Sequence, residues 1–142
     1  MRLIPVGLTL ALLVGCTSID VRPVAGGVRL ERVCIVENEE VLVDDLLSVL
    51  RDGFDRHGIA TSVVQPAHAD ACETTLTYTA ARGWDLVPYL DEAELRLWRS
   101  GRQIGAADYR HRGGFALTKF AGTKKKMDPV IDQLLAGSRN ER

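Results

Sequence analysis

Apolar and polar positions recur with two different periods along this chain, and each change of period marks a predicted element. Residues 29–36 are rich in β-branched side chains and apolar on both parities toward their end, which predicts a strand well inside a sheet. Asn38 is predicted to cap a following helix that ends at His57 and Gly58. The apolar face of this helix follows helical spacing and consists of Leu42, Val43, Leu46, Leu47, Leu50 and Phe54.

The period shortens to two after this helix, as it does in strands. Residues 59–65 and 72–85 predict two strands, and the second has threonines on one face and larger apolar side chains on the other. Residues 87–99 predict a third, with apolar odd positions. These segments therefore predict a sheet with one buried and one more polar face.

A hairpin is predicted to continue this sheet. Ser100-Gly101 is suited to a two-residue hairpin loop, which places Leu97 opposite Ile104 on the next strand. The apolar positions of the two strands then match across the ladder. This match supports the predicted register from both sides.

The last predicted element is a helix that contains Pro129 to Leu135, with Asp128 as a cap and residues 123–126 as an optional preceding turn. The order of elements is therefore β-α-β-β-β-β-α. We expect an α+β fold, a two-layer sandwich in which a mainly antiparallel sheet of about four to five strands carries two helices on one face. This single domain is predicted to span residues 28–137, followed by a tail at 138–142.

An apolar run opens the chain. Arg2 is the only charge before residues 3–14, and this run is shorter than the ~20 residues that a bilayer span needs. A positive start, a short apolar middle and a small residue, Gly15, are typical of a bacterial export signal rather than a transmembrane helix.

The stretch Leu13-Val14-Gly15-Cys16 resembles the lipobox of bacterial lipoproteins. The resemblance implies that residues 1–15 are removed, that the sulfur of Cys16 carries a diacylglycerol and that its amino group carries an acyl chain. Several acyl chains together make a stable membrane anchor. Thr17, where inner-membrane lipoproteins of the enteric type carry Asp, favours the outer membrane and its periplasmic side. An ordinary signal peptide with a cysteine near its cleavage site is the alternative.

Residues 16–27 are predicted to be a lipidated tether between this anchor and the domain. They contain Pro23 and the pair Gly26-Gly27. Such composition is typical of flexible connections.

The chain has three cysteines. With Cys16 assigned to the lipid, Cys34 and Cys72 remain, and an even pair in an oxidising compartment predicts a disulfide. His57 and His68 leave a metal site as one alternative, although no CxxC or HxxxH motif accompanies them. The other alternative is that Cys34 and Cys72 are two free thiols.

The charge balance and the motifs exclude several functions. The formal net charge is −1, which argues against nucleic acid as a partner. The sequence has no GxSxG, no HExxH and no glycine-rich phosphate loop followed by a lysine. We therefore predict no catalytic residue, no metal and no cofactor beyond the covalent lipid, and an enzyme is the least favoured class.

Two features favour binding. Trp98 lies on the polar parity of its strand and suits contact with an envelope protein, whereas Trp84, after Gly83, is expected to cover the edge of the core. A segment without acids between residues 108 and 128 is a candidate for binding anionic lipid or lipopolysaccharide, or else a solvated face. Its basic residues are Arg110, Arg112, Lys119, Lys124, Lys125 and Lys126.

Several stretches, with the lipobox, resemble one family of proteobacterial envelope lipoproteins that is known by a locus-tag name: CIVEN, RHGI, LTYTAARGWD, AELRL, IGAADY, GGFALTKF and DPVIDQLL. The resemblance covers residues 16–135, and this chain has Phe120 where the family usually has Trp. It implies an envelope location and a small α+β fold, and no activity. We expect a lipid-anchored, non-catalytic protein that binds an envelope protein, with anionic lipid as the alternative ligand. The sequence specifies no oligomeric state.

Overall fold

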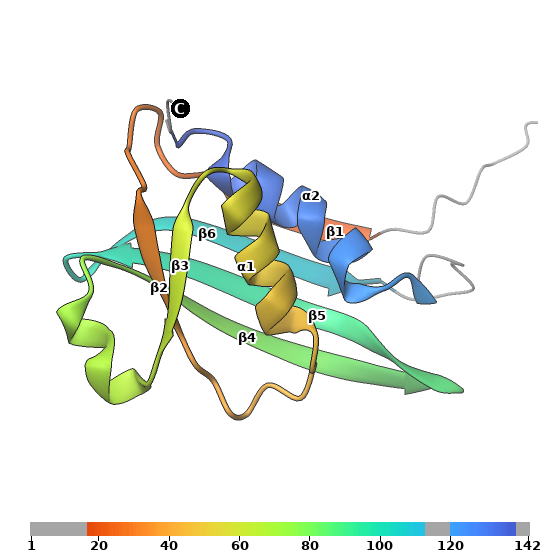
Figure 1. The fold of residues 1–142 in the computed structure, drawn as a ribbon. Coiled ribbons are helices and arrows are strands. Elements are labelled where there is room, and N and C mark those ends of the chain that lie inside the picture. The colour runs from red at the N-terminus through yellow and green to blue at the C-terminus, as the bar shows by residue number, and fades with distance from the viewer. Residues whose placement is uncertain (1–16, 113–119, 139–142) are drawn as a thin grey trace, which may run out of the picture.

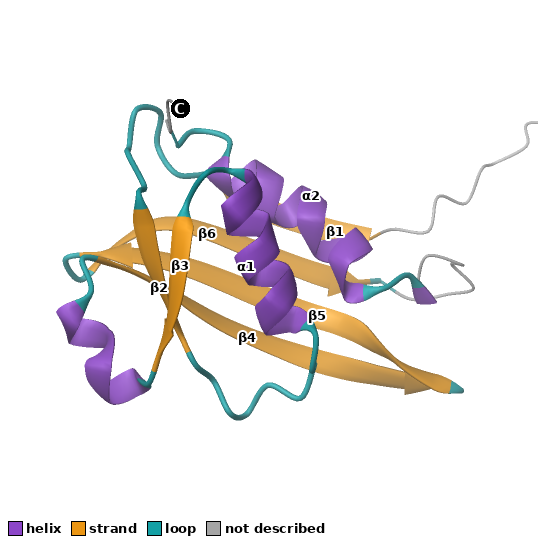
Figure 2. Cartoon of the chain, viewed as in Figure 1, coloured by secondary structure: helices purple, strands orange, loops and turns teal. Residues whose placement is uncertain are grey.

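Six strands form one mixed sheet, in the spatial order β1-β6-β5-β4-β2-β3. The computed structural model describes residues 17–112 and 120–138, and both α-helices lie on the same face of the sheet (Figures 1 and 2). The elements in chain order are β1 (Thr17–Arg22), β2 (Arg32–Val36), α1 (Leu46–Arg56), β3 (Ala60–Val64), the short 3-10 helix η1 (Pro66–Ala71), β4 (Thr74–Asp85), β5 (Val87–Arg99), β6 (Arg102–His111) and α2 (Thr123–Leu135).

The predicted α+β sandwich is confirmed, with six strands instead of about four to five. β2 pairs in parallel with β3 and β4, and the remaining neighbours are antiparallel. Within the described ranges, neither helix is long and apolar enough to cross a bilayer. The predicted leader, Cys16, Lys119 and residues 139–142 lie outside the described residues.

The segment predicted as a tether begins as a strand instead. β1 pairs antiparallel with β6 along its whole length, and Ile19 and Val21 pack against the core. Val24, beyond the strand, is buried and donates its N–H to a main-chain carbonyl of α2 at 2.9 Å. A short alternating segment becomes a strand here because β6 has a free edge to pair with. The folded domain therefore includes β1 and Val24, which were predicted to lie before its start at residue 28.

α1 begins at Leu46 rather than directly after Asn38. The Asn38 side chain is instead used in a long-range contact, in which Nδ2 donates to the carbonyl of Tyr78 at 3.0 Å and Oδ1 accepts the N–H two residues further on. These bonds hold the chain in a turn, so Asp45 takes the N-cap position, without a side-chain capping bond. The predicted end of the helix is confirmed at His57.

α2 starts at Thr123, so the optional turn at residues 123–126 is part of the helix, and Gly122 rather than Asp128 is its N-cap. The Asp128 carboxylate lies inside the helix, where Lys124 Nζ is 3.0 Å and Arg56 Nη2 is 2.9 Å away. Arg56 also bonds Asp132 at 2.9 Å. One arginine of α1 thus joins the two helices across their contact.

The predicted hairpin between β5 and β6 is confirmed, but its register is not. Ser100 and Gly101 form the loop with φ angles of 51° and 72°. A β-bulge then shifts the ladder, so that Leu97 lies opposite Gly105 rather than Ile104. The hydrophobic pattern alone does not report such an inserted residue.

Candidate functional site

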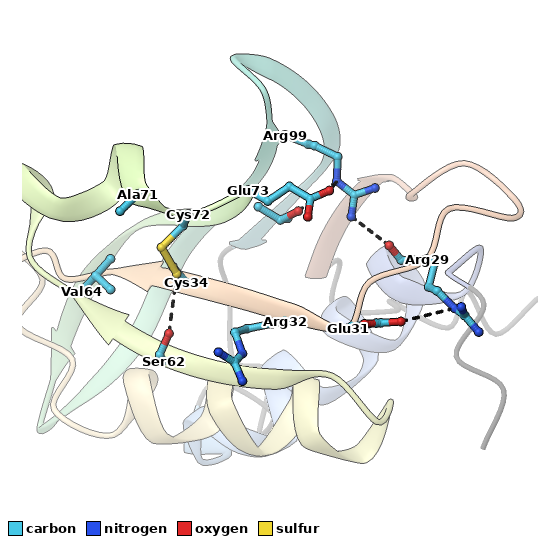
Figure 3. Close-up of a pocket in the computed structure, with 11 residues that line it drawn as sticks. Arg29, Glu31, Arg32, Cys34, Ser62, Val64, Ala71, Cys72, Glu73 and Arg99 are labelled. Atoms are coloured by element: carbon cyan, nitrogen blue, oxygen red, sulfur yellow. Dashed lines mark hydrogen bonds and ion pairs between the residues drawn. A yellow bond between two sulfur atoms is a disulfide. The ribbon is translucent and has the colours of Figure 1, made fainter.

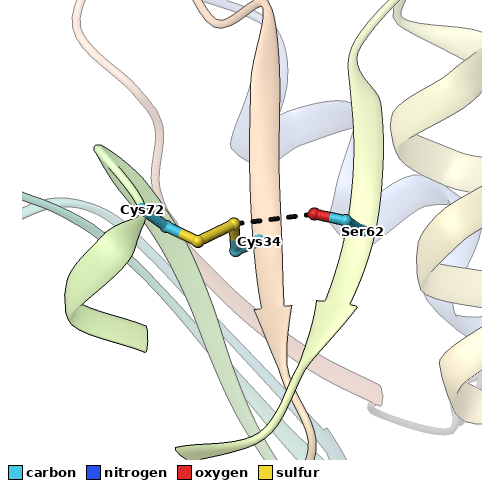
Figure 4. Close-up of a disulfide and its surroundings, with 3 residues drawn as sticks. All are labelled: Cys34, Ser62 and Cys72. Atoms are coloured by element: carbon cyan, nitrogen blue, oxygen red, sulfur yellow. Dashed lines mark hydrogen bonds between the residues drawn. A yellow bond between two sulfur atoms is a disulfide. The ribbon is translucent and has the colours of Figure 1, made fainter. Parts of the chain in front are cut away.

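The disulfide predicted between Cys34 and Cys72 is present. Cys34 lies on β2, and Cys72 comes just before β4, the parallel neighbour of β2, so the sheet brings the two sulfurs together (Figure 4). On the other side of β2 the Ser62 hydroxyl donates to Cys34 Sγ at 3.6 Å. The bridge excludes the alternatives in which these cysteines are free thiols or metal ligands.

The two histidines considered for a metal site lie elsewhere. His57 Nε2 is 2.9 Å from Asp132 Oδ1 at the contact between the helices, and His68 is exposed on η1. Burial raises the pKa of Asp132, but hydrogen bonds from His57 and Arg56 outweigh it and hold that pKa below its ordinary value. Among the described residues, no group of three or more His, Cys, Asp or Glu side chains is placed to hold a metal.

A surface cleft of about 660 Å³ opens beside the disulfide and is lined by arginines (Figure 3). Arg29 lies 3.7 Å from Glu31, and Arg99 lies 3.6 Å from Glu73. Arg32 has no ion-pair partner in the part of the chain that the structure describes. The lining contains no histidine, its thiols are joined in the bridge and its glutamates are paired. The cleft can attract an anionic group, but it has no nucleophile beside a free base.

The predicted basic patch is divided by the fold. Arg110, on the uncovered face of the sheet, pairs with Glu92 at 2.6 Å. Lys124, on α2, pairs with Asp128 one helical turn later. Two of the proposed binding charges are therefore neutralised by neighbouring carboxylates.

The remaining basic residues also point to different environments. Arg112 and Lys125 are exposed, without an ion-pair partner among the described residues, and Lys126 is buried. Lys119 lies outside the described residues. The described residues of this segment therefore do not form a continuous cationic surface.

Lys126 belongs to a buried polar cluster. Its Nζ donates to the carbonyl of Leu90 at 2.9 Å and lies 5.3 Å from the centroid of the Tyr89 ring. Burial lowers the pKa of Lys126, while the nearby Asp91 carboxylate acts in the opposite direction. The ring of His111 meets Tyr89 edge to face at 5.7 Å, and neither of its nitrogens has a hydrogen-bond partner among the described residues. The cluster ties α2 to β5 and β6.

The two tryptophans lie in contrasting places. Trp98 is half-buried on the face of the sheet that the helices leave uncovered, and its Nε1 donates to Thr77 Oγ1 at 3.0 Å. Trp84 is 76% exposed, so the prediction that it covers the edge of the core is wrong.

Sequence reasoning missed the group to which Trp84 belongs. β4 turns into β5 at Leu86, and residues 84–87, named here the hairpin apex, expose Leu86 to 88% and Val87 to 50%. The turn between β4 and β5 contains no Asn-Gly or Gly-Gly pair, so the sequence lacks the residues that usually identify a hairpin turn. Apolar residues stand at the junction of the two predicted strands, where turn-forming residues are expected. This substitution is the sequence feature that could have identified the apex.

Comparison with known proteins bears on the fold. No protein-family model and no curated protein matches this chain. Two solved structures of the PelC dodecamer from Paraburkholderia phytofirmans, one of a Leu-to-Met variant in space group C2 and one in P6, are similar to it. Each is 13% identical, covers 87% of this chain and 100% of its own, and superposes with a TM-score of 0.53 for the variant and 0.54 for the other. This chain therefore shares the PelC fold.

Proposed function

We propose that this chain is a lipid-anchored protein of the cell envelope, facing the periplasm, which acts by binding an envelope protein rather than by catalysis. This proposal rests mainly on the roles of the three cysteines of the chain. Cys34 and Cys72 are joined to each other, which is typical of an exported protein. Cys16, the cysteine outside this bridge, ends the apolar leader at the position where a lipobox carries its acyl chains.

The uncovered face of the sheet is the surface that suits a protein partner. Trp98 lies there on β5, and the ion pairs Arg96–Asp108 at 2.5 Å and Arg110–Glu92 at 2.6 Å join β5 to β6. Aromatic and arginine side chains held in fixed positions are typical of the residues that dominate binding energy in protein interfaces. The similar PelC structures are dodecamers, so a second copy of this chain is the first partner to test.

Anionic lipid or lipopolysaccharide is the second candidate ligand. Arg112 and Lys125 favour it, because both are exposed and neither has an ion-pair partner among the described residues. Binding through these two charges should be weak and sensitive to salt. Charge reversal at both positions should remove the salt-sensitive part of the binding of the Cys16→Ser protein to anionic vesicles, and a salt dependence that persists unchanged removes this candidate.

The anchor is tested by labelling cells with palmitate. We expect label in the wild-type protein and none in Cys16→Ser, a larger share of which should be recovered outside the membrane fraction. The double variant Cys34→Ser, Cys72→Ser is the matched control and should remain labelled, because only the bridge is lost. Unlabelled wild-type protein, or unchanged fractionation of Cys16→Ser, would overturn the proposal.

The protein contact is tested by crosslinking in intact envelopes and by light scattering of the detergent-extracted protein. We expect a defined complex, of copies of this chain or with another envelope protein, that Trp98→Ala weakens. Trp84→Ala, at the far end of the same strand pair, serves as the control and should leave the complex intact. A protein that stays monomeric and uncrosslinked would exclude the binding role.

A further inference from the structure

The hairpin apex combines exposed apolar side chains with an unfavourable backbone. Single exposed apolar residues are ordinary, but Trp84, Leu86 and Val87 form a group, and such groups mark interaction sites. Leu86 has a φ of 63°, in the left-handed region that Gly, Asn and Asp adopt most easily. A leucine in this position lowers stability, and it gains no packing in return because it is almost fully exposed. Such an outlier points to a role outside the fold.

The apex projects beyond the rest of the sheet. Arg110 of β6 lies opposite Ser18 of β1 on one side and opposite Glu92 of β5 on the other, so these residues share one level. From Glu92 the hairpin continues to Leu86, with one residue taken up by a β-bulge. At ~3.3 Å per strand residue the apex extends roughly 15 Å past that level. Figure 1 shows it at the end of the domain where the chain enters β1.

The same end carries the proposed anchor. Cys16 directly precedes Thr17, the first residue of β1, so no linker separates an acylated cysteine from the sheet. The membrane surface must then lie within a few ångström of the start of β1, and a projection of this length reaches the lipid. We propose that the hairpin apex inserts into the membrane that holds the acyl chains of Cys16. This inference rests on the proposed function.

The chemistry of the apex fits the interface of a bilayer. Tryptophan concentrates at that level, and leucine and valine favour the adjoining hydrocarbon. Insertion stops there, because Asp85 is costly to place in hydrocarbon and the outer strand edges of the apex need water for their backbone groups. Leu86 therefore enters deepest, with Trp84 at the level of the headgroups.

Two exposed basic residues lie at this end of the domain. Arg82 lies on β4 just before the apex, and Lys125 lies on the first turn of α2, beside Thr17. Such charges attract anionic headgroups over about a Debye length. They orient the domain with its apex toward the lipid, and the apolar side chains then supply the contact that salt does not screen.

The two tryptophans allow a direct test in the full-length, lipidated protein. Trp98→Phe leaves Trp84 as the single fluorophore, and Trp84→Phe leaves Trp98 at the far end of the same strands as the internal control. Each variant is reconstituted into phosphatidylethanolamine–phosphatidylglycerol vesicles containing brominated phospholipid. We expect emission from Trp84 to shift to shorter wavelength and to be quenched, and emission from Trp98 to change little.

A second measurement removes the anchor. The Cys16→Ser protein should still partition into these vesicles, and Leu86→Gly in that protein should lower the partition coefficient by about tenfold, through loss of one leucine side chain from the lipid. Ser100→Gly, at the opposite hairpin loop, is the matched control and should leave it unchanged.

The outcomes separate this inference from the proposed function. Protein that takes up palmitate and stays with vesicles, while Trp84 remains unquenched, keeps the anchor and overturns apex insertion. Quenching of Trp84 without palmitate uptake supports insertion and overturns the lipid anchor. Loss of both signals overturns both.

Discussion

The two ends of β4 differ in how they are held and in what they expose. At its start Cys72 is bridged to Cys34, and Arg99 binds Thr74 Oγ1 at 3.0 Å. At its other end, the hairpin apex exposes apolar side chains around Leu86, at an unfavourable φ. One end is arranged for stability, whereas the other gives up local stability to present a surface. Such a division is expected where a fold carries a functional element, because the rest of the structure must compensate for it.

Removal of the bridge should have the largest effect. The double variant Cys34→Ala, Cys72→Ala frees a loop closed across 38 positions and should lower the free energy of unfolding by about 4 kcal/mol, through the greater entropy of the unfolded chain. Urea unfolding with and without reductant measures it. Equal midpoints for reduced and oxidised wild type would show that this end does not depend on the disulfide.

Gly83→Ala should perturb the hairpin end next most strongly. A Cβ at this position would clash with Cζ of Tyr89, its cross-strand partner, so the Tyr89 ring, which also contacts Lys126 and His111, must shift. We expect a loss of about 1–3 kcal/mol in urea unfolding. In a Tyr89→Ala background Gly83→Ala should lower the free energy of unfolding only a little. An equally large loss in that background would mean that the clash with Tyr89 does not cause the destabilisation.

Leu86→Gly should raise stability, by up to about 1 kcal/mol, because glycine adopts positive φ without the steric cost that leucine meets. Thermal unfolding of the detergent-free Cys16→Ser protein measures this gain. Ser100→Gly, which also relieves a positive φ, should stabilise the domain too but leave vesicle binding intact. A loss of stability in Leu86→Gly would show that the apex contributes to folding.

The smallest effect concerns pH. Burial lowers the pKa of Lys126 below its ordinary 10.5, so the unfolded chain binds the proton more tightly and stability rises as pH increases toward 10.0. Burial and the Asp91 charge raise the pKa of Tyr109 above 10.0, which reverses the trend at higher pH. Lys126→Met should flatten the rise, and the exposed neighbour variant Lys125→Met should retain it. If the free energy of unfolding rises equally with pH in the two variants, the rise is due to another group.

Much of the fold could be predicted because it depends on local pattern. The apolar stripe of α1 is buried as predicted at Leu46, Leu50 and Phe54, since helical spacing places these side chains on one face whatever that face meets. The bridge between Cys34 and Cys72 followed from counting cysteines in an exported chain. The lipid anchor at Cys16 stays a prediction.

The errors occurred where a residue's role depends on a distant partner. β1 exists because β6 offers a free edge, and Asn38 bonds Tyr78, 40 positions away, instead of capping a helix. Lys126 is polar in sequence yet lies under Tyr89, so one of the predicted binding residues is part of the interior.

The sequence by itself determined the class of fold, the helical stripe and the pairing of two cysteines, because spacing and residue type are local properties. Tertiary structure decided which edge β1 closes, which charges are paired and that Trp84 projects into solvent, because each depends on where a long-range partner ends. A hairpin apex that passes the end of its sheet is visible only once the neighbouring strands have been placed beside it.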